Sequence, residues 1–488
     1  MFSMFLKYGG MRMIKDGMFR LLAFFLIFLF MGCKSNSNEF LESNSQDPVT
    51  ITLWHSYYGA QKIAFDKMVK EFNETEGYVK GIFVEAIACV NMNELNSNIM
   101  DFIKKEKAEN KLPNLFSAYS DTAYYMDQLG LLANIDDYIK EKEIHEYVDA
   151  YIEEGRSLSG SKLKIFPIAK ATEIMMVNKT VWDLFAADTG LKIEDLATWE
   201  GIVQASKTYY DWSGGKSFFG RDAMSNYMLV GSKQLGQEIF EVKNGQVKVQ
   251  INDDIMRRLW DCFYIPYVKG YYKAVGRFRS DDIKTGDIIA FVGSTSSMVY
   301  FPDQVAINDQ ESYSIESMVL PLPNFEGTVP YAVQQGAGMV VVKSDFIKEY
   351  ASVEFLKWFT EAERNTQFSI QSAYLPVKKQ ANDYKFIQKQ LQLYEDENMT
   401  ISHLALPVIF DQINDSRLYT SSVFSKGTEV RHILDNSLLT KAQTDRKIIL
   451  QYMAQGQSQE EATKSFLTDE NFEKWLLDFK IRLQILLQ

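Results

Sequence analysis

The sequence predicts an α/β protein with two lobes and a ligand cleft between them. Between residues 49 and 139, strand-like and helix-like patterns alternate, as in a sheet that is covered by helices. A later apolar stretch, Ile165–Val177, becomes polar halfway, at Lys170, Thr172 and Glu173. A strand inside one core stays apolar or alternates strictly, so this stretch is expected to cross between two cores. For this stretch alone, an edge strand with a solvated kink is the alternative.

The length of the chain also favours more than one domain, because 488 residues exceed the size of a typical single domain. An apolar fraction of 46% and an aromatic fraction of 14% allow substantial cores. The formal net charge of −12 argues against nucleic acid as a partner. The four histidines show no metal-ligand spacing, so neither a metal nor a cofactor is expected.

The first 32 residues have the pattern of a signal peptide. Residues 21–31 form an unbroken apolar run of 11 residues, which is too short to span a bilayer but typical of a signal peptide. The basic residues before this run are Lys7, Arg12, Lys15 and Arg20. Because this basic region is long, the start codon is left open among Met1, Met11, Met13 and Met18.

The apolar run ends in Phe30-Met31-Gly32-Cys33, which resembles the lipobox of bacterial lipoproteins. Two positions depart from that pattern, because Phe30 replaces the usual leucine and Met31 replaces a small residue. The resemblance implies that Cys33 carries fatty acyl chains such as palmitate, which anchor the protein to the extracytoplasmic face of the cell membrane. Residues 33–48, rich in serine and asparagine, are then a lipidated tether. A signal anchor with an incidental cysteine is the alternative.

The folded part opens with a strand from Val49 that runs into a polar and aromatic turn, followed by a helix over Gln61–Glu74. A second strand, Val79–Ala88, a helix over Asn91–Asn110 and a short strand before Tyr119 follow. Ligands of open α/β sheets bind beyond the carboxyl ends of the strands, so the turns there provide the first candidate contacts. These candidates are Trp54, His55, Ser56, Tyr57, Tyr119 and Asp121.

The polar centre of the crossing stretch adds Lys170, Thr172 and Glu173 to the candidate ligand contacts. Lys170 can donate a hydrogen bond to a ligand and Glu173 can accept one, or the two can hold the crossing strands together. Alternation along the strand places Lys170 and Thr172 on one face and Glu173 on the other.

The next segment continues with helices and short strands. Thr198 is a favourable N-cap for a helix that extends to Tyr210. After residue 218, Arg221 and Asp222 precede a predicted helix. These two side chains are either polar ligand contacts or a buried ion pair. Two residues of the helix itself complete the candidates from this segment, Asn226 and Tyr227.

Two later stretches carry further candidates. Residues 286–292 form a buried strand, and the turn after it contains Ser294, Thr295 and Ser296, where a helix begins. Free N–H groups and hydroxyls in this turn can bind a ligand or simply cap the helix. A strand over residues 331–342 contains Gln334 and Gln335, whose amides both donate and accept hydrogen bonds, as sugar hydroxyls require. Residues 380–488 are predicted to be helical, and they contain the segments Thr428–Leu439, Gln459–Phe466 and Asn471–Leu487.

Together these patterns resemble the extracellular solute-binding proteins of bacterial ABC importers, in the branch of the maltodextrin and glycerol-phosphate receptors. The landmarks are Ile51–Gly59, Pro113–Asp121, Gly130–Ile139, Phe166–Lys179, Gly286–Tyr300, Val319–Ser344 and the helix from Ala351. The resemblance implies the two-lobe periplasmic-binding-protein fold, with hinge crossings near Ala169–Thr172, Gly286–Phe291 and Gln334–Gly338. It also marks Tyr374 as a residue near the cleft.

On this basis, residues 49–169 and 287–335 are expected to form lobe 1, and residues 170–286 and 336–488 to form lobe 2. The expected function is a lipid-anchored monomeric receptor that captures a sugar or oligosaccharide by lobe closure and delivers it to a membrane permease. An anionic solute such as a glycerol phosphate ester is the alternative ligand, because Lys170 and Arg221 are cationic. An exported carbohydrate-active enzyme and an anchored adhesin are the other classes. The pairing of Cys89 with Cys262 is left open, with free buried thiols favoured.

Overall fold

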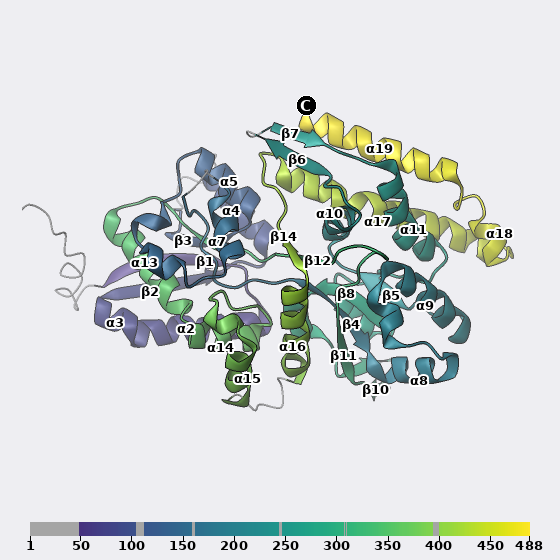
Figure 1. Ribbon diagram of the computed structural model, residues 1–488, viewed down its shortest axis with the longest axis horizontal. Helices are drawn as coiled ribbons and strands as arrows, with labels where there is room; N and C mark the ends of the chain where they lie inside the picture. Colours follow the sequence, from purple (N-terminus) through teal and green to yellow (C-terminus); the bar gives the residue numbers. More distant parts are fainter. Residues whose placement is uncertain are drawn as a thin grey trace, which may run out of the picture.

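The computed structural model describes residues 48–103, 112–158, 162–243, 246–306, 308, 310–393 and 400–488. Two sheets with their covering helices lie side by side and form two lobes (Figure 1). The predicted signal peptide, Cys33 and the tether up to residue 47 lie outside the described residues. Within the described ranges, no helix combines the length and the apolar character that a bilayer crossing requires.

Lobe 1 is built on a four-stranded sheet. Its elements are β1 (Val49–His55), α2 (Gly59–Glu74), α3 (Glu76–Lys80), β2 (Ile82–Ala88), α4 (Met92–Ile103), β3 (Leu115–Ala118), α5 (Ser120–Gln128), η1 (Ile135–Asp137), α6 (Glu141–Ile144), α7 (Asp149–Arg156), β13 (Gly338–Val341), α13 (Phe346–Phe359), α14 (Ala362–Ser372), η4 (Gln380–Asn382) and α15 (Tyr384–Leu393). The strand order is β13-β3-β1-β2, with β13 antiparallel to β3 and the other pairs parallel. Alternation turns Ile51 and Leu53 toward α2, α13 and α14, whereas Phe116 and Val340 pack with α4 and α5.

Lobe 2 is built on a second four-stranded sheet. Its elements are β4 (Glu173–Asn178), α8 (Lys179–Thr189), η2 (Ile193–Ala197), α9 (Trp199–Trp212), β5 (Phe219–Arg221), α10 (Met224–Gln234), β6 (Phe240–Lys243), β7 (Gln246–Val249), α11 (Asp253–Val268), α12 (Arg279–Lys284), β8 (Ala290–Ser294), η3 (Thr295–Tyr300), β9 (Gln304–Ala306), β10 (Ser312–Ser314), β11 (Ser317–Pro321), β12 (Tyr331–Val333), α16 (Thr400–Asp415), β14 (Arg417–Tyr419), α17 (Gly427–Ala454), α18 (Gln459–Thr463) and α19 (Asp469–Leu487).

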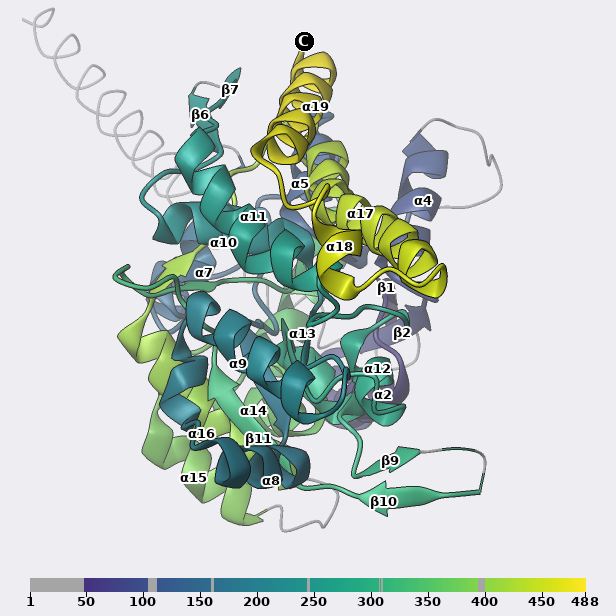
Figure 2. The same cartoon turned by 90° about the vertical axis from the view of Figure 1, so that its right-hand side faces the viewer.

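The second sheet has the order β11-β4-β8-β5, in which β4 is antiparallel to both neighbours. Both faces of β4 are buried, because Met175 and Val177 join one apolar cluster while Ile174 and Met176 join another. This explains the unbroken apolar run along β4. Figure 2 shows β9 and β10 as a hairpin that projects from lobe 2, and α17 packs against both α11 and α19.

The predicted division into lobes was wrong for residues 287–335 and for residues 336–393. β8 and β11, expected in lobe 1, pair with β4 in the second sheet, and β13, expected in lobe 2, pairs with β3 in the first. The predicted crossing at Gly286–Phe291 is therefore not a crossing. An apolar strand that is buried on both faces has the same pattern in either sheet, so the pattern alone does not assign its lobe.

The chain passes between the lobes at residues 169–172 and 334–338, and these two crossing segments are bonded to each other. The N–H of Ala171 donates to the carbonyl oxygen of Gln335 at 2.8 Å, and the N–H of Gln335 donates back at 2.9 Å. After α15 in lobe 1, the next described element is α16, which packs against β11 of lobe 2. Helices of the C-terminal region then complete lobe 2, where Val430, Trp475 and Phe479 belong to its core.

The two cysteines of the described chain are free and lie in different lobes. Cys262 is buried in α11, whereas Cys89, directly after β2, is only half-buried. The expectation of free thiols is confirmed, and the expectation that both are buried holds for Cys262 alone.

Candidate ligand-binding site

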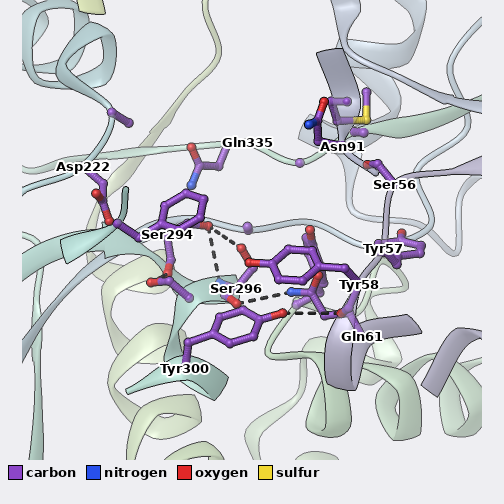
Figure 3. A pocket seen from close by; sticks show the side chains of 18 of the residues that line it. Ser56, Tyr57, Tyr58, Gln61, Asn91, Asp222, Ser294, Ser296, Tyr300 and Gln335 are labelled. Atoms are coloured by element: carbon purple, nitrogen blue, oxygen red, sulfur yellow. Dashed lines mark hydrogen bonds between the residues drawn. The ribbon is translucent and has the colours of Figure 1, made fainter. Parts of the chain in front are cut away.

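A cavity of about 640 Å³ lies between the lobes, next to the crossing segments (Figure 3). Lobe 1 lines it with Ser56, Tyr57, Tyr58, Gln61, Val90, Asn91, Met92, Asn93, Ser117, Tyr119 and Tyr374. Lobe 2 contributes Glu173, Asp222, Ala223, Arg277, Phe278, Ser280, Ser294, Ser296, Ser297 and Tyr300, and the crossing segments contribute Ala171, Gln335, Gly336 and Ala337. The cavity therefore lies beyond the ends of β1 and β3 in lobe 1 and of β5 and β8 in lobe 2.

The lobe 1 wall is the turn between β1 and α2. Behind it, His55 is fully buried, and its Nδ1 accepts a hydrogen bond from the N–H of Tyr57 at 3.2 Å. Burial lowers the pKa of His55 to about 4, so this histidine is neutral at physiological pH and supports the turn from behind. The ring of Tyr57 packs edge-on against Tyr374, with centroids 5.9 Å apart.

The lobe 2 wall includes the serine-rich turn from β8 into η3. The Ser294 side chain caps η3 by accepting from the N–H of Ser296 at 3.4 Å, and the two hydroxyls lie 2.9 Å apart. Ser297 donates to the carbonyl oxygen of Ser294 at 2.6 Å. Capping and cavity lining therefore occur in the same turn. Thr295 is fully buried and does not line the cavity.

The floor of the cavity is the buried carboxylate of Glu173, at the start of β4. It accepts hydrogen bonds from Nη2 of Arg221 at 2.8 Å and from Nδ2 of Asn226 at 3.0 Å. Nδ2 of Asn226 also lies 2.9 Å from Oε1 of Gln335, a lining residue. Arg221 is itself held between aromatic rings, with its guanidinium 5.3 Å from the Trp199 ring. The ion pair left open for Arg221 and Asp222 does not join these two residues, because Arg221 pairs with Glu173 and Asp222 pairs with Arg279.

Asp222 is the second carboxylate at the cavity. It accepts hydrogen bonds from the backbone N–H of Arg279 at 3.2 Å and from Nε of Arg279 at 3.4 Å. Burial raises the pKa of Asp222 to about 6, although the Arg279 charge opposes the rise. The carboxyl group thus changes its protonation state close to neutral pH.

Lys170, a predicted ligand contact, points away from the cavity. Its Nζ lies 2.7 Å from Oε2 of Glu154 in α7 and 3.3 Å from the carbonyl oxygen of Gly336. Glu154 also accepts a hydrogen bond from the side chain of Gln334. Thr172 is buried and contacts Gln412 of α16. These residues join the crossing segments to both lobes, which corrects the ligand-contact prediction for Lys170, Thr172 and Gln334.

The full set of predicted contacts divides into residues that line the cavity and residues that do not. Ser56, Tyr57, Tyr119, Glu173, Asp222, Ser294, Ser296, Gln335 and Tyr374 line the cavity, and Trp54, His55, Asp121, Lys170, Thr172, Arg221, Asn226, Tyr227, Thr295 and Gln334 do not. Trp54 packs in the cluster under α4, because side chains along β1 alternate between the two faces. Tyr227 is buried, and its hydroxyl donates to the carbonyl oxygen of Leu259.

Several lining residues were missed from the sequence. Tyr58 and Tyr300 stack across the two lobes, with centroids 5.2 Å apart and planes 3° from parallel, and the Tyr300 hydroxyl donates to the Tyr58 carbonyl oxygen at 3.4 Å. Beside them, Nε2 of Gln61 donates to the carbonyl oxygen of Ser296 at 3.2 Å. Asn91 follows the end of β2, so the expectation that ligands bind beyond the carboxyl ends of strands would have found it. Tyr300 follows no strand end, and no sequence pattern marks it.

The lining of the cavity is rich in tyrosine, serine and amide side chains. Tyrosines, serines and amides supply flat apolar faces and groups that both donate and accept hydrogen bonds. The charged groups at the floor are compensated within the protein, as Glu173 pairs with Arg221 and Asp222 with Arg279. Arg277 brings a cationic group to the lining, beside Phe278.

The solved structures that resemble the chain share this two-lobe α/β architecture. The UgpB protein of Mycobacterium tuberculosis, in complex with glycerophosphocholine, matches with a TM-score of 0.64 and 18% identity over 83% of this chain and 99% of that one. The Listeria monocytogenes protein Lmo0181, in complex with cycloalternan, matches with a TM-score of 0.62 and 16% identity over 86% of this chain and 99% of that one. The GacH receptor of Streptomyces glaucescens matches with a TM-score of 0.61 and 14% identity over 88% of this chain and 99% of that one. At such identities the likeness shows the fold.

The family is shown by a match in sequence. The family model of the bacterial extracellular solute-binding proteins matches residues 67–395, about two thirds of the chain. No curated protein sequence matches the chain. The matched residues include most of both sheets and both crossing segments. The chain therefore belongs to the bacterial extracellular solute-binding protein family.

Proposed function

We propose that this solute-binding protein is the receptor of an ABC importer and that its ligand is a neutral sugar or oligosaccharide. The observation that carries the proposal is the lining of the 640 Å³ cavity, where tyrosines, serines and amides from both lobes surround floor charges that are already paired. Sugars present apolar ring faces and hydroxyls that donate and accept hydrogen bonds, and this lining offers partners for both.

The cationic groups bear on the choice between a neutral and an anionic ligand. Lys170 is bound to Glu154 and Arg221 to Glu173, so neither is free to pair with an anionic solute. Arg277 does line the cavity, and for this reason a glycerol phosphate ester is the second candidate ligand. UgpB, a structural neighbour, is solved with glycerophosphocholine, which also supports keeping this candidate.

In this proposal the protein binds its ligand and does not catalyse a reaction on it. A glycoside hydrolase needs a pair of carboxyl groups, one as acid and one as base or nucleophile. Both oxygens of Glu173 are occupied, one by Arg221 and the other by Asn226. A carboxylate held in this way is a poor nucleophile, which favours a receptor over an enzyme.

Delivery to a permease follows from lobe closure in this proposal. Residues of both lobes reach the cavity, so a ligand gains its full set of contacts when the lobes are together, and binding shifts the equilibrium toward that arrangement. The paired crossing segments at Ala171 and Gln335 act as the hinge. The closed receptor then docks on the membrane subunits.

The lipid anchor at Cys33 is a further part of the proposal, supported by the basic start, the apolar run and the lipobox-like residues before it. A Cys33→Ser variant is expected to incorporate no labelled fatty acid and to leave the membrane fraction or stay unprocessed. Continued labelling of that variant would contradict the anchor. Metabolic labelling followed by fractionation checks this directly.

The ligand class is tested by releasing and identifying what the native receptor carries. The protein is purified from its native membranes without added sugars, denatured, and the released small molecules are analysed by mass spectrometry. The proposal predicts a neutral saccharide. A phosphate ester would favour the second candidate and would contradict the neutral-sugar proposal.

A further inference from the structure

Outside the cavity, the segment between β14 and α17 joins the two lobes. Figure 1 shows the chain from β14 running between α5 of lobe 1 and α10 of lobe 2 before α17 begins. Neighbouring residues of this segment pack on different lobes. Val423 packs against the lobe 1 cluster of α4 and α5, and Phe424 belongs to the lobe 2 core, with its ring 5.6 Å from that of Phe240.

A charged contact lies beside this segment. Asp121, in the first turn of α5, points at Gly427, the first residue of the 28-residue helix α17. A Cβ atom at position 427 would clash with the Asp121 carboxylate. The backbone of Gly427 is not left-handed, so its local conformation does not require a glycine, and the Asp121 side chain is the group that an added Cβ atom would displace.

The start of α17 and the charges around it act on the Asp121 carboxyl group in opposite directions. The N-terminus of a long helix carries unpaired N–H groups and a partial positive charge, and both favour a carboxylate at that place. Burial raises the pKa of the Asp121 carboxyl group, the charge of Arg431, one turn into α17, opposes this rise, and the charge of Glu429 adds to it. Asp121, Arg431 and Phe424 border the same small cavity between α5 and α17.

We infer that Asp121 and Val423 form a latch between the lobes that biases the receptor toward the closed arrangement and thereby sets its affinity without touching the ligand. The inference rests on the proposed function, since it assumes that binding requires closure. Separating the lobes must withdraw Asp121 from α17 and Val423 from the lobe 1 cluster. Apparent affinity scales with the fraction of binding-competent molecules, so loss of the latch lowers it.

Gly427→Ala is the sharpest test of the latch, because alanine suits a helix better than glycine while its Cβ displaces Asp121. We expect an unfolding midpoint equal to or above that of the wild type, together with an affinity that is about three- to tenfold lower. Asp121→Asn, which keeps the size of the side chain, is expected to act in the same direction. The matched control is Asp149→Asn, a first-turn acidic residue of α7 whose partner, Lys379, lies 2.7 Å away.

Two measurements are made on the full mature chain: X-ray scattering without ligand and calorimetric titration with neutral oligosaccharides. The latch predicts a larger radius of gyration for ligand-free Gly427→Ala and Asp121→Asn than for the wild type and Asp149→Asn, and a parallel loss of affinity. Equal dimensions and equal affinities in all four proteins would overturn it. If the wild type binds no saccharide, the proposed function fails, and the ligand-free scattering alone decides whether the latch exists.

Discussion

At the scale of single residues, about half of the predicted contacts line the cavity, and the predictions failed where side chains have partners from distant segments. Ser56, Tyr119 and Ser294 follow strand ends and line the cavity. Lys170 lies in the first crossing segment, before β4 begins, and its partner is Glu154 in α7, a pair that no spacing in the sequence indicates. The charged residue in an apolar stretch therefore indicated the crossing between the lobes correctly, but it did not indicate the partner of the charge.

The pairing of Lys170 makes it a stability residue. The side chains of Lys170 and Glu154 are 4% and 10% exposed, and removing one partner of a buried pair leaves an uncompensated charge. Lys170→Met is expected to lower the free energy of unfolding by about 3–5 kcal/mol, with part of the loss recovered when Glu154→Gln is added. Denaturant unfolding measures both.

The matched control for that variant is Lys207→Met, which removes an exposed pair with Asp211 and should cost less than about 1 kcal/mol. If Lys170→Met weakens ligand binding and leaves the unfolding free energy unchanged, the structural role is wrong, and the direct ligand contact first considered from the sequence is restored.

Asp222 predicts a pH dependence of stability. Its pKa is about 6 in the folded protein against an ordinary value of 3.8, so the folded state holds the proton to higher pH than the unfolded state does. Between these two values, its contribution to stability falls as the pH rises, by about 1.4 kcal/mol for each pH unit. The advantage of Asp222→Asn over the wild type should therefore grow from pH 4 to pH 6 and then level off. Unfolding curves of both proteins across this range check it, and a constant difference would contradict the assignment.

At the scale of elements, local patterns predicted most strands and helices but not their partners. The strand from Val49, its turn and the following helix are present as β1 and α2. The helix predicted at Thr428–Leu439 continues to Ala454, because apolar residues such as Leu438 and Ile449 keep one face in the lobe 2 core. Pairing of β8 with β4 depends on contacts far apart in sequence, and the predicted lobe division failed at that point.

Packing of α7 on Ile165, which precedes the first crossing segment, supplies an element-scale prediction. A Cβ atom at Gly155 would clash with the carbonyl oxygen of Ile165, a backbone atom that cannot turn aside. Gly155→Ala is expected to lower the free energy of unfolding by about 1–3 kcal/mol, although alanine is the better helix former. Gly427→Ala is the matched control, because there the obstructing group is a side chain. Equal unfolding free energies for Gly155→Ala and the wild type would show that α7 can shift without cost.

At the scale of the whole molecule, the family resemblance predicted the fold class, and the family match confirms it. The cavity lies where the resemblance implied, next to the paired segments at Ala171 and Gln335. What the sequence could not supply is the set of contacts between lobes, such as Tyr58 with Tyr300 or Asp121 with α17. These contacts depend on how the lobes face each other, which no local pattern encodes.

The central claim, that a neutral saccharide binds in the cavity between the lobes, is tested most directly by calorimetric titration of the wild type and two tyrosine variants. Tyr119, the N-cap residue of α5, lines the cavity and is 48% exposed, whereas Tyr125, within α5 and 40% exposed, does not line it. We predict saturable binding of a neutral oligosaccharide, a loss of about 1.5–3 kcal/mol in Tyr119→Ala from the missing apolar contact, and unchanged affinity in Tyr125→Ala. Binding confined to phosphate esters, or full affinity in Tyr119→Ala, would contradict the account.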